Sequence, residues 1–193
     1  MQTPKKGSKK LLNAWAFYDW ANSVYSLVIA SSVFPLYYQA LFSSAGIEYI
    51  SIFGGTIRST PLITYTTAIA FIFISLLIPI LSGIADFVGN KKVFMKFFCY
   101  LGAFSCMGLY FFNLENILTS LLFYFLALIG FWCSWIFYNS YLPDVAYPEQ
   151  QDKLSAKGFS LGYIGSVLLL LFNLAMIMFP ESFGLGDDGA SKM

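Results

Sequence analysis

Polar residues in an otherwise apolar stretch near the N-terminus are the first candidates for chemistry. Asp19 is followed by Asn22, Ser23 and Ser26 at offsets of three, four and seven residues. On a helix these offsets place all four side chains on one face. A carboxylate beside an amide can bind a polar solute or carry a proton, but a polar cluster near a helix end can also be simply hydrated. Both interpretations of Asp19 and Asn22 stay open at this point.

Further candidates are two amides and a repeat of small residues in the second half of the chain. Asn139 and Asn173 lie in apolar stretches, and an amide there needs a partner beyond its own side chain, so both are weaker candidates for lining a cavity. Gly158, Gly162 and Ser166 recur every four residues. This spacing is typical of closely packed membrane helices and needs no ligand to explain it.

Several kinds of chemistry are excluded by residues that the chain lacks. It contains no histidine, which removes histidine-based triads, most catalytic zinc sites and histidine proton relays. Gly158 to Gly162 match the nucleophile-elbow pattern of hydrolases, but no strand precedes them and no histidine base is present. Three scattered cysteines in apolar stretches predict neither a disulfide framework nor a metal site: Cys99, Cys106 and Cys133. We therefore expect no enzyme, no metal and no cofactor.

The composition predicts which kind of secondary structure positions these residues. The 193 residues are 58% hydrophobic, 20% aromatic and only 11% charged, and the mean hydropathy is +0.69. Soluble domains carry about 25% charged residues, so this chain lacks a water-facing surface. Charge-free stretches cover 20–47, 59–85, 97–114, 116–143 and 158–180. The sequence excludes a soluble enzyme, a disordered tail and a disulfide-stapled secreted domain, and predicts an all-α protein of the lipid bilayer.

We expect five transmembrane helices, over about 13–41, 61–85, 94–114, 117–142 and 157–180. The net charge of +1 and the lack of a dense basic stripe argue against a nucleic-acid partner. Pro35 and Pro79 predict kinks late in the first two spans. Pro148, with Glu149 beside it, predicts the first turn of a short cytoplasmic helix before the fifth span.

The distribution of basic residues predicts the orientation. Nine lysines fall in alternate connections that share one side of the membrane, namely Lys5, Lys6, Lys9, Lys10, Lys91, Lys92, Lys96, Lys153 and Lys157, and the other side has only Arg58 and Lys192. The positive-inside rule then makes 1–10 a cytoplasmic N-terminus, 11–180 the transmembrane bundle and 181–193 an extracytoplasmic tail. In a bacterium the membrane would be the inner membrane.

Four segments occur in an order that resembles a known family: Trp15–Ser23 with the run YDWANS, Asp86–Lys92, Tyr138–Asp144 and Ser155–Gly165. Together they resemble the vacuole-effluxer-like branch of the major facilitator superfamily, over roughly residues 11 to 189. The resemblance implies two six-helix halves, transport of small solutes by alternating access, and amino acids as a solute class by analogy. It also implies that Asp86 and Gly89 form a conformational latch between the halves.

Two departures from the family pattern matter. Ser82 stands where the loop motif has glycine, and Phe87 stands where a basic residue follows the aspartate. The five expected spans also make an incomplete N-terminal six-helix half. The chain is then either the N-terminal portion of a longer transporter or a naturally short chain that needs a partner subunit. The alternative function is a non-transporting membrane partner or assembly subunit that docks through the face of Gly158, Gly162 and Ser166.

Overall fold

The computed structural model describes residues 5–52 and 54–184 and consists almost wholly of helices. Their bounds are α1 (Lys9–Val24), a π-helical segment (Tyr25–Val33), α2 (Phe34–Ala45), α3 (Ser59–Val88), α4 (Lys91–Gly108), a 3-10 turn (Leu109–Phe111), α5 (Ile117–Ser140), α6 (Leu142–Val145), α7 (Pro148–Met178) and a second 3-10 turn (Pro180–Phe183). Five continuous helical segments in the described part are long and apolar enough to cross a membrane. This confirms the predicted all-α membrane fold.

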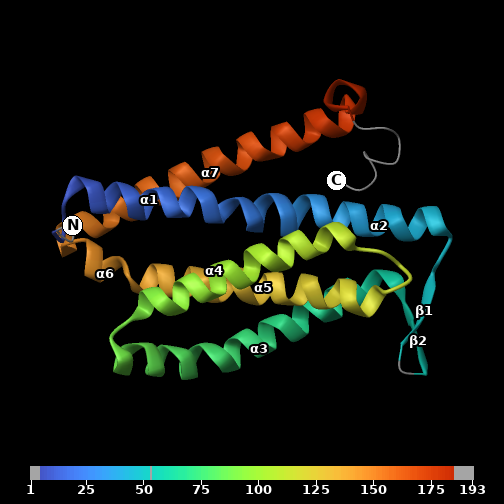
Figure 1. Ribbon diagram of the computed structural model, residues 1–193, viewed down its shortest axis with the longest axis horizontal. Coiled ribbons are helices and arrows are strands. Elements are labelled where there is room, and N and C mark those ends of the chain that lie inside the picture. The colour runs from blue at the N-terminus through green and yellow to red at the C-terminus, as the bar shows by residue number, and fades with distance from the viewer. Residues whose placement is uncertain (1–4, 53, 185–193) are drawn as a thin grey trace.

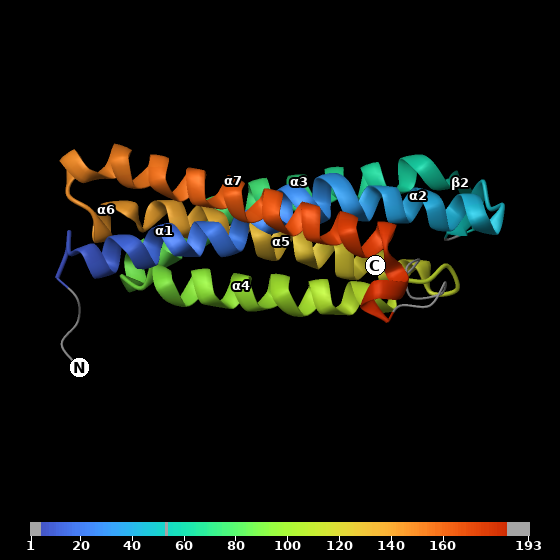
Figure 2. The same cartoon turned by 90° about the horizontal axis from the view of Figure 1, so that it is seen from above.

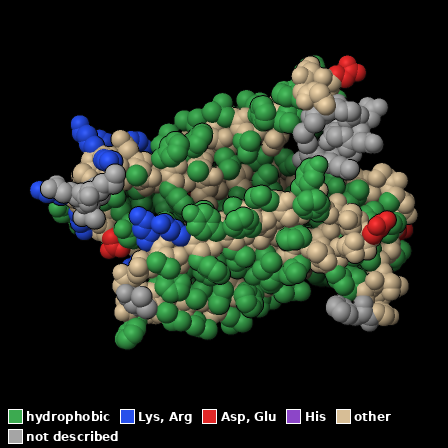
Figure 3. Space-filling model, in the orientation of Figure 1, with side chains coloured by type: hydrophobic (Ala, Val, Ile, Leu, Met, Phe, Trp, Pro, Cys, Tyr) green, Lys and Arg blue, Asp and Glu red, His purple; other side chains and the backbone are tan. Residues whose placement is uncertain are grey.

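The long helices form an elongated bundle in which sequence neighbours run in opposite directions (Figures 1 and 2). α4 packs along α5, α3 packs on another side of α5, and α1 packs along α7. α7 diverges from α2 towards its C-terminal end (Figure 1). The start of α1, the α3–α4 turn and α6 share one end of the bundle (Figure 1). The lysines gather at this end (Figure 3), which we call the lysine end.

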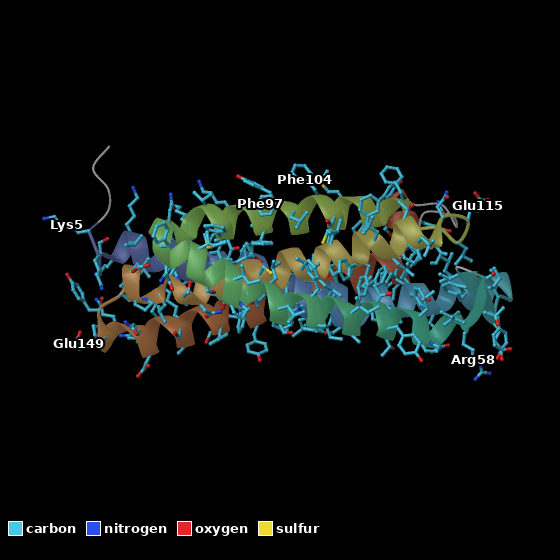
Figure 4. The ribbon with its side chains drawn as sticks, turned by 90° about the horizontal axis from the view of Figure 1, so that it is seen from below. Lys5, Arg58, Phe97, Phe104, Glu115 and Glu149 are labelled. Carbon is cyan, nitrogen blue, oxygen red and sulfur yellow. The ribbon has the colours of Figure 1, made fainter. Side chains whose placement is uncertain are left out.

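The surface of the bundle suits lipid. Apolar side chains cover most of the face seen in Figure 3. Phe97 and Phe104 of α4 are 60% and 67% exposed and point away from the bundle (Figure 4). A continuous apolar surface of this kind marks a membrane-facing or partner-facing region. The long apolar spans indicate that this surface faces the membrane, because lipid is as apolar as these side chains.

The first span is a composite helix, and Pro35 gives the physical reason. A proline has no backbone N–H, and its ring collides with the carbonyl of the residue four positions earlier. Immediately before it the helix widens into the π-helical segment, where the Phe34 N–H donates to the carbonyl of Ile29. Ser31 and Ser32 also donate to carbonyls five residues back, at 2.7 and 2.9 Å. The α-helical spacing that placed the polar side chains on one face therefore applies only up to Val24.

Two boundaries differ from the sequence-based expectation. The fifth helix begins at Pro148 and continues to Met178, so the short separate helix expected there is wrong. Pro148 does start the helix, where the Tyr147 N–H donates to the Gln150 side chain at 3.1 Å. The third span ends at Phe111 rather than at 114. Residues 185–193 of the expected tail lie outside the described residues.

A small hairpin of strands β1 (Tyr49–Ile52) and β2 (Gly55–Arg58) joins α2 to α3 at the end opposite the lysines (Figure 1). Arg58 pairs with Glu48 at 2.5 Å, on the exposed edge of this hairpin. The hydrogen bond that Arg58 donates to the Glu48 carboxylate raises the pKa of the Arg58 guanidinium above its ordinary value. The sequence analysis did not predict the hairpin.

The tightest helix contact joins α4 and α5 at Gly102 and Gly130. A Cβ added to Gly130 would lie 2.4 Å from the Gly102 nitrogen and 2.8 Å from the Phe98 carbonyl oxygen. No side chain fits at Gly130, so this position depends on glycine, whereas a Cβ on Gly102 would lie 3.3 Å from the Phe131 nitrogen. The approach holds α5 close against α4, and α5 is the helix that supplies aromatic side chains to the site described next.

Candidate functional site

Asp19 is buried within the bundle, with only 2% of its surface exposed. Its Oδ1 accepts a hydrogen bond from Ser23 Oγ at 3.2 Å. A Cβ added to Gly158 of α7 would lie 3.3 Å from Oδ2, so the glycine leaves room for the carboxylate between the helices. Burying a carboxylate is costly unless it is paired, protonated or fully hydrogen-bonded. Among the described residues no basic side chain forms a salt bridge with Asp19.

Aromatic rings cover Asp19 on the side of the lysine end. The Trp15 ring stacks on the Tyr138 ring of α5 with centroids 4.2 Å apart, and Tyr18 stacks on Tyr138 at 4.9 Å. The Tyr138 hydroxyl donates to the Trp15 carbonyl at 3.2 Å, and the Trp15 indole donates to the Tyr138 carbonyl at 3.4 Å. These reciprocal bonds fix α1 against α5. The spacing of Ser134 and Tyr138 in the sequence already places both on one helix face, but Tyr138 was not among the predicted site residues.

A cavity of about 220 Å³ lies next to this carboxylate, between the first span, α5 and α7. Its lining consists of Ser23, Ser26, Leu27, Phe131, Trp132, Trp135, Phe159, Gly162, Tyr163 and Ser166. We call this space the α1–α5–α7 cavity. Ser23 both lines it and donates to Asp19, so the carboxylate lies one side chain behind the wall. The lining combines five aromatic side chains with three serine hydroxyls and the hydroxyl of Tyr163, and it contains no charged side chain.

The structure brings only some of the predicted site residues to this cavity. Asn22 follows Asp19 by one helical turn, and its buried Nδ2 has no hydrogen-bond partner among the described residues. Asn139 donates to the Trp135 carbonyl of its own helix at 2.9 Å. Asn173 lines a different cavity of about 770 Å³, where α7 diverges from α2. Asn139 and Asn173 are therefore not assembled with Asp19.

The small-residue face of α7 is occupied by α1 of the same chain. Besides Gly158 against Asp19, a Cβ on Gly162 would lie 2.7 Å from Ser23 Oγ. Ser166 is buried in the same contact region and lines the α1–α5–α7 cavity. This face is therefore not free to dock another subunit, which disfavours the alternative function that the sequence left open.

The sequence is also similar to known proteins. The family model described as "Vacuole effluxer Atg22 like" matches residues 7–188. The chain belongs to this family. It is 39% identical over 170 residues to the "Uncharacterized MFS-type transporter YxiO" of Bacillus subtilis (strain 168). The alignment covers 88% of this chain and 38% of that relative, so the chain spans well under half of the relative's length. No solved structure matches the chain.

As a member of the Atg22-like family, the chain is an integral multi-pass membrane protein, and its predicted latch can be located. Asp86 lies at the exposed end of α3, and its Oδ1 is 3.3 Å from Lys91 Nζ. Gly89 has a left-handed φ of +68° and ends α3, which turns the chain so that Lys91 can return to Asp86. Phe87, at the position where the family has a basic residue, is 93% exposed. Lys91 thus supplies a positive charge beside Asp86.

This latch region forms a polar cleft of about 370 Å³ at the lysine end. It is lined by Asp86, Gly89, Asn90, Lys91, Lys92, Tyr141 and Asp144. Lys91 Nζ also donates to the Ser140 carbonyl at 3.5 Å, which links the α3–α4 turn to the end of α5. The cleft is separate from the α1–α5–α7 cavity, and its residues contact loops and helix ends. The conformational latch that the family resemblance implies for Asp86 and Gly89 stays a prediction.

The remaining sequence-based candidates give no second site. In 5–52 and 54–184 no three histidine, cysteine or acidic side chains lie close enough to hold a metal ion. Cys99, Cys106 and Cys133 are free thiols, the last of them buried. Gly158 to Gly162, which match the hydrolase pattern, lie inside the continuous helix α7 rather than on a strand-to-helix turn.

Proposed function

We propose that this chain is the N-terminal part of a secondary transporter that moves small solutes by alternating access. The observation that carries the proposal is a cavity backed by a buried carboxylate within a bundle of the MFS-type family. Ser26 and Tyr163 line it near the midpoints of their spans. Secondary transporters bind solute near the bilayer midplane, where two structural repeats face each other.

The proposal requires a second half of the transporter that this chain does not contain. One wall of a transport site is formed here, and the facing wall would come from a C-terminal half or, for a naturally short chain, from a partner subunit. The 38% coverage of the Bacillus relative supports the first possibility. An open reading frame after Met193 with six or seven further hydrophobic segments would establish it. An in-frame stop in the native gene directly after that residue would contradict it.

The proposal also includes the orientation of the chain in the membrane. The lysine end would face the cytoplasm, and in a bacterium the protein would lie in the inner membrane. Nine lysines lie at that end, whereas the basic residue at the other end of the described part is Arg58, and this distribution supports the orientation by the positive-inside rule.

Asp19 is the proposed coupling residue, with Asn22 as its neighbour. A buried ionisable group inside a membrane bundle is a candidate for a proton or solute pathway. Replacing Asp19 with Asn in the complete protein keeps its size and removes its charge. We expect solute movement driven by a pH gradient to be abolished, whereas Asp152→Asn, on the exposed surface of α7, should retain it. Unchanged pH-driven movement in Asp19→Asn would remove the residue from the mechanism.

Flux measurements test the function itself. The complete encoded protein is reconstituted into proteoliposomes, and a panel of radiolabelled solutes that includes amino acids is offered with and without a pH gradient. Amino acids enter the panel because the family resemblance suggests them. Gradient-dependent flux of any member supports the proposal. A stoichiometric membrane complex that shows no flux for any solute would contradict it and favour an assembly subunit.

A further inference from the structure

We propose that the α1–α5–α7 cavity binds the ammonium end of a solute with an apolar body, in competition with a proton on Asp19. The inference rests on the proposed transport function and adds a chemical class of ligand to it. Amines and amino acids share this ammonium group. The experiment below therefore separates these two sources.

The aromatic lining is the first argument. Phe131, Trp132 and Trp135 come from α5, and Phe159 and Tyr163 face them from α7. Aromatic faces attract ammonium groups, and several rings around one space form the cage that recognises such ligands. The Trp132 and Trp135 rings lie nearly perpendicular, at 81° with centroids 5.7 Å apart. Two differently oriented indoles offer one solute both a ring face and a ring edge.

The hydroxyl groups supply acceptors for the ammonium hydrogens. Ser23 Oγ donates its proton to Asp19, and Ser26 Oγ donates to the Ser23 carbonyl at 3.1 Å. Because each donor is already used, the oxygen lone pairs of both hydroxyls remain as acceptors towards the cavity. These two hydroxyls can accept hydrogen bonds from an N–H group, whereas their own protons are not free to bind a carboxylate.

The charges near the cavity point to a cation. Asp19 lies behind Ser23, and no lysine or arginine lines the cavity. Lys157, one residue before Gly158, donates to Asn13 Oδ1 at 2.6 Å. A carboxylate in a weakly polar interior attracts a cation and repels an anion far more strongly than it would in water. An anionic solute would find no countercharge in this wall.

Proton competition follows from the groups that face Asp19. These are the Tyr18 hydroxyl of its own helix and the Tyr138 hydroxyl of α5. α4 contributes the Cys99 thiol near Tyr18, and α7 presents only glycine at Gly158 and Gly162. None of these groups is a cation at neutral pH. A proton or a solute cation can therefore supply the missing positive charge, and binding of one weakens binding of the other.

The test uses tryptophan fluorescence, because Trp132 and Trp135 lie in the cavity wall. The complete encoded protein in detergent is titrated with phenethylamine, phenethyl alcohol, phenylalanine and N-acetylphenylalanine at about pH 8 and again at about pH 6. These probes share an aromatic body and differ in charge. We expect phenethylamine to bind at least about tenfold more tightly than the alcohol, a difference of about 1.4 kcal/mol. We also expect its binding to weaken at the lower pH.

The other probes identify the source of the ammonium group. Phenylalanine binding as tight as that of phenethylamine assigns amino acids, and binding of phenethylamine alone assigns simple amines, so both results support the inference. Binding of the alcohol or of the anion N-acetylphenylalanine at least as tight as that of the amine would overturn it. So would amine binding that does not change with pH.

Variants assign the effect to the cavity. Asp19→Asn should bind phenethylamine no better than the alcohol and lose the pH dependence, whereas Asp152→Asn should behave like the wild type. If Asp19→Asn does not fold, Trp135→Leu provides the test, since it should weaken amine binding about tenfold while alcohol binding changes less. Equal loss for both ligands would count against the aromatic cage. Amine binding without flux would refute the proposed transport function and leave this inference intact. Flux of an anion without amine binding would refute this inference and leave the transport function intact.

Discussion

Replacement of Gly130 by alanine is the sharpest structural test of the bundle. The added Cβ would lie 2.4 Å from the Gly102 nitrogen, 2.5 Å from the Gly102 Cα and 2.8 Å from the Phe98 carbonyl oxygen. Non-bonded heavy atoms prefer separations of about 3.5–4.0 Å, so α4 and α5 would have to move apart by about 1 Å. All three neighbours are backbone atoms, and no side-chain rotation can relieve the contact.

The matched control is Gly83→Ala in α3, where an added Cβ has no neighbour within 4 Å. Both substitutions gain the helix propensity of alanine, about 1 kcal/mol. Only Gly130→Ala adds overpacking, which costs about 1–3 kcal/mol. We expect the unfolding temperature of Gly130→Ala to lie below that of Gly83→Ala, by about 2–4 °C for each kcal/mol in a chain of this size.

Thermal unfolding of the two purified variants in the same detergent, followed by tryptophan fluorescence, measures this difference. Gly130→Ala should also elute earlier from a size-exclusion column, or aggregate, after mild heating that leaves Gly83→Ala folded. Equal or higher stability of Gly130→Ala would refute the close backbone contact between α4 and α5. It would also undermine the position that this contact gives to Trp132 and Trp135.

Three further predictions test other parts of the molecule. Tyr138→Phe keeps the ring stack on Trp15 but removes a buried hydrogen bond, so thermal unfolding should show a loss of about 1 kcal/mol; an unchanged unfolding temperature would contradict that bond. Asp86→Asn breaks the ion pair with Lys91. Because the Asp86 side chain is exposed, stability should change by less than about 1 kcal/mol, while the maximal transport rate in proteoliposomes falls. Normal flux would remove the latch from the mechanism. Impermeant reagents should modify cysteines placed at Lys92 and at Arg58 from opposite faces of the membrane, and reaction from the same face would overturn the topology.

Much of the bundle could be predicted because lipid imposes simple rules on a sequence. Charge-free stretches of membrane-crossing length predict the helices, and one buried carboxylate on an apolar helix stands out by its cost. The sequence left open whether Asp19 is hydrated or faces the bundle interior, and its side chain is buried. The small-residue spacing of α7 predicts close packing, and α1 supplies the packing partner.

The remaining features depend on tertiary context. The π-helical segment before Pro35 cannot be distinguished by composition from a kinked α-helix, and it changes which side chains share a face after Val24. Asn139 was expected to need an external partner, but it donates to the Trp135 carbonyl of its own helix. The aromatic wall was also missed, because Trp132 and Phe159 become neighbours of one cavity only when α5 and α7 are placed beside α1.

Labelling of a cysteine at Ser26 tests the central claim, that solute passes through the α1–α5–α7 cavity. Ser26→Cys is prepared in a protein whose native cysteines are replaced by alanine, with Phe104→Cys on the lipid-facing side of α4 as the control. In proteoliposomes the account predicts that a water-soluble thiol reagent modifies Ser26→Cys, that a transported solute slows this reaction, and that Phe104→Cys is not modified. Transport that continues while Ser26→Cys is unreactive, or reacts at the same rate with and without solute, would contradict the account.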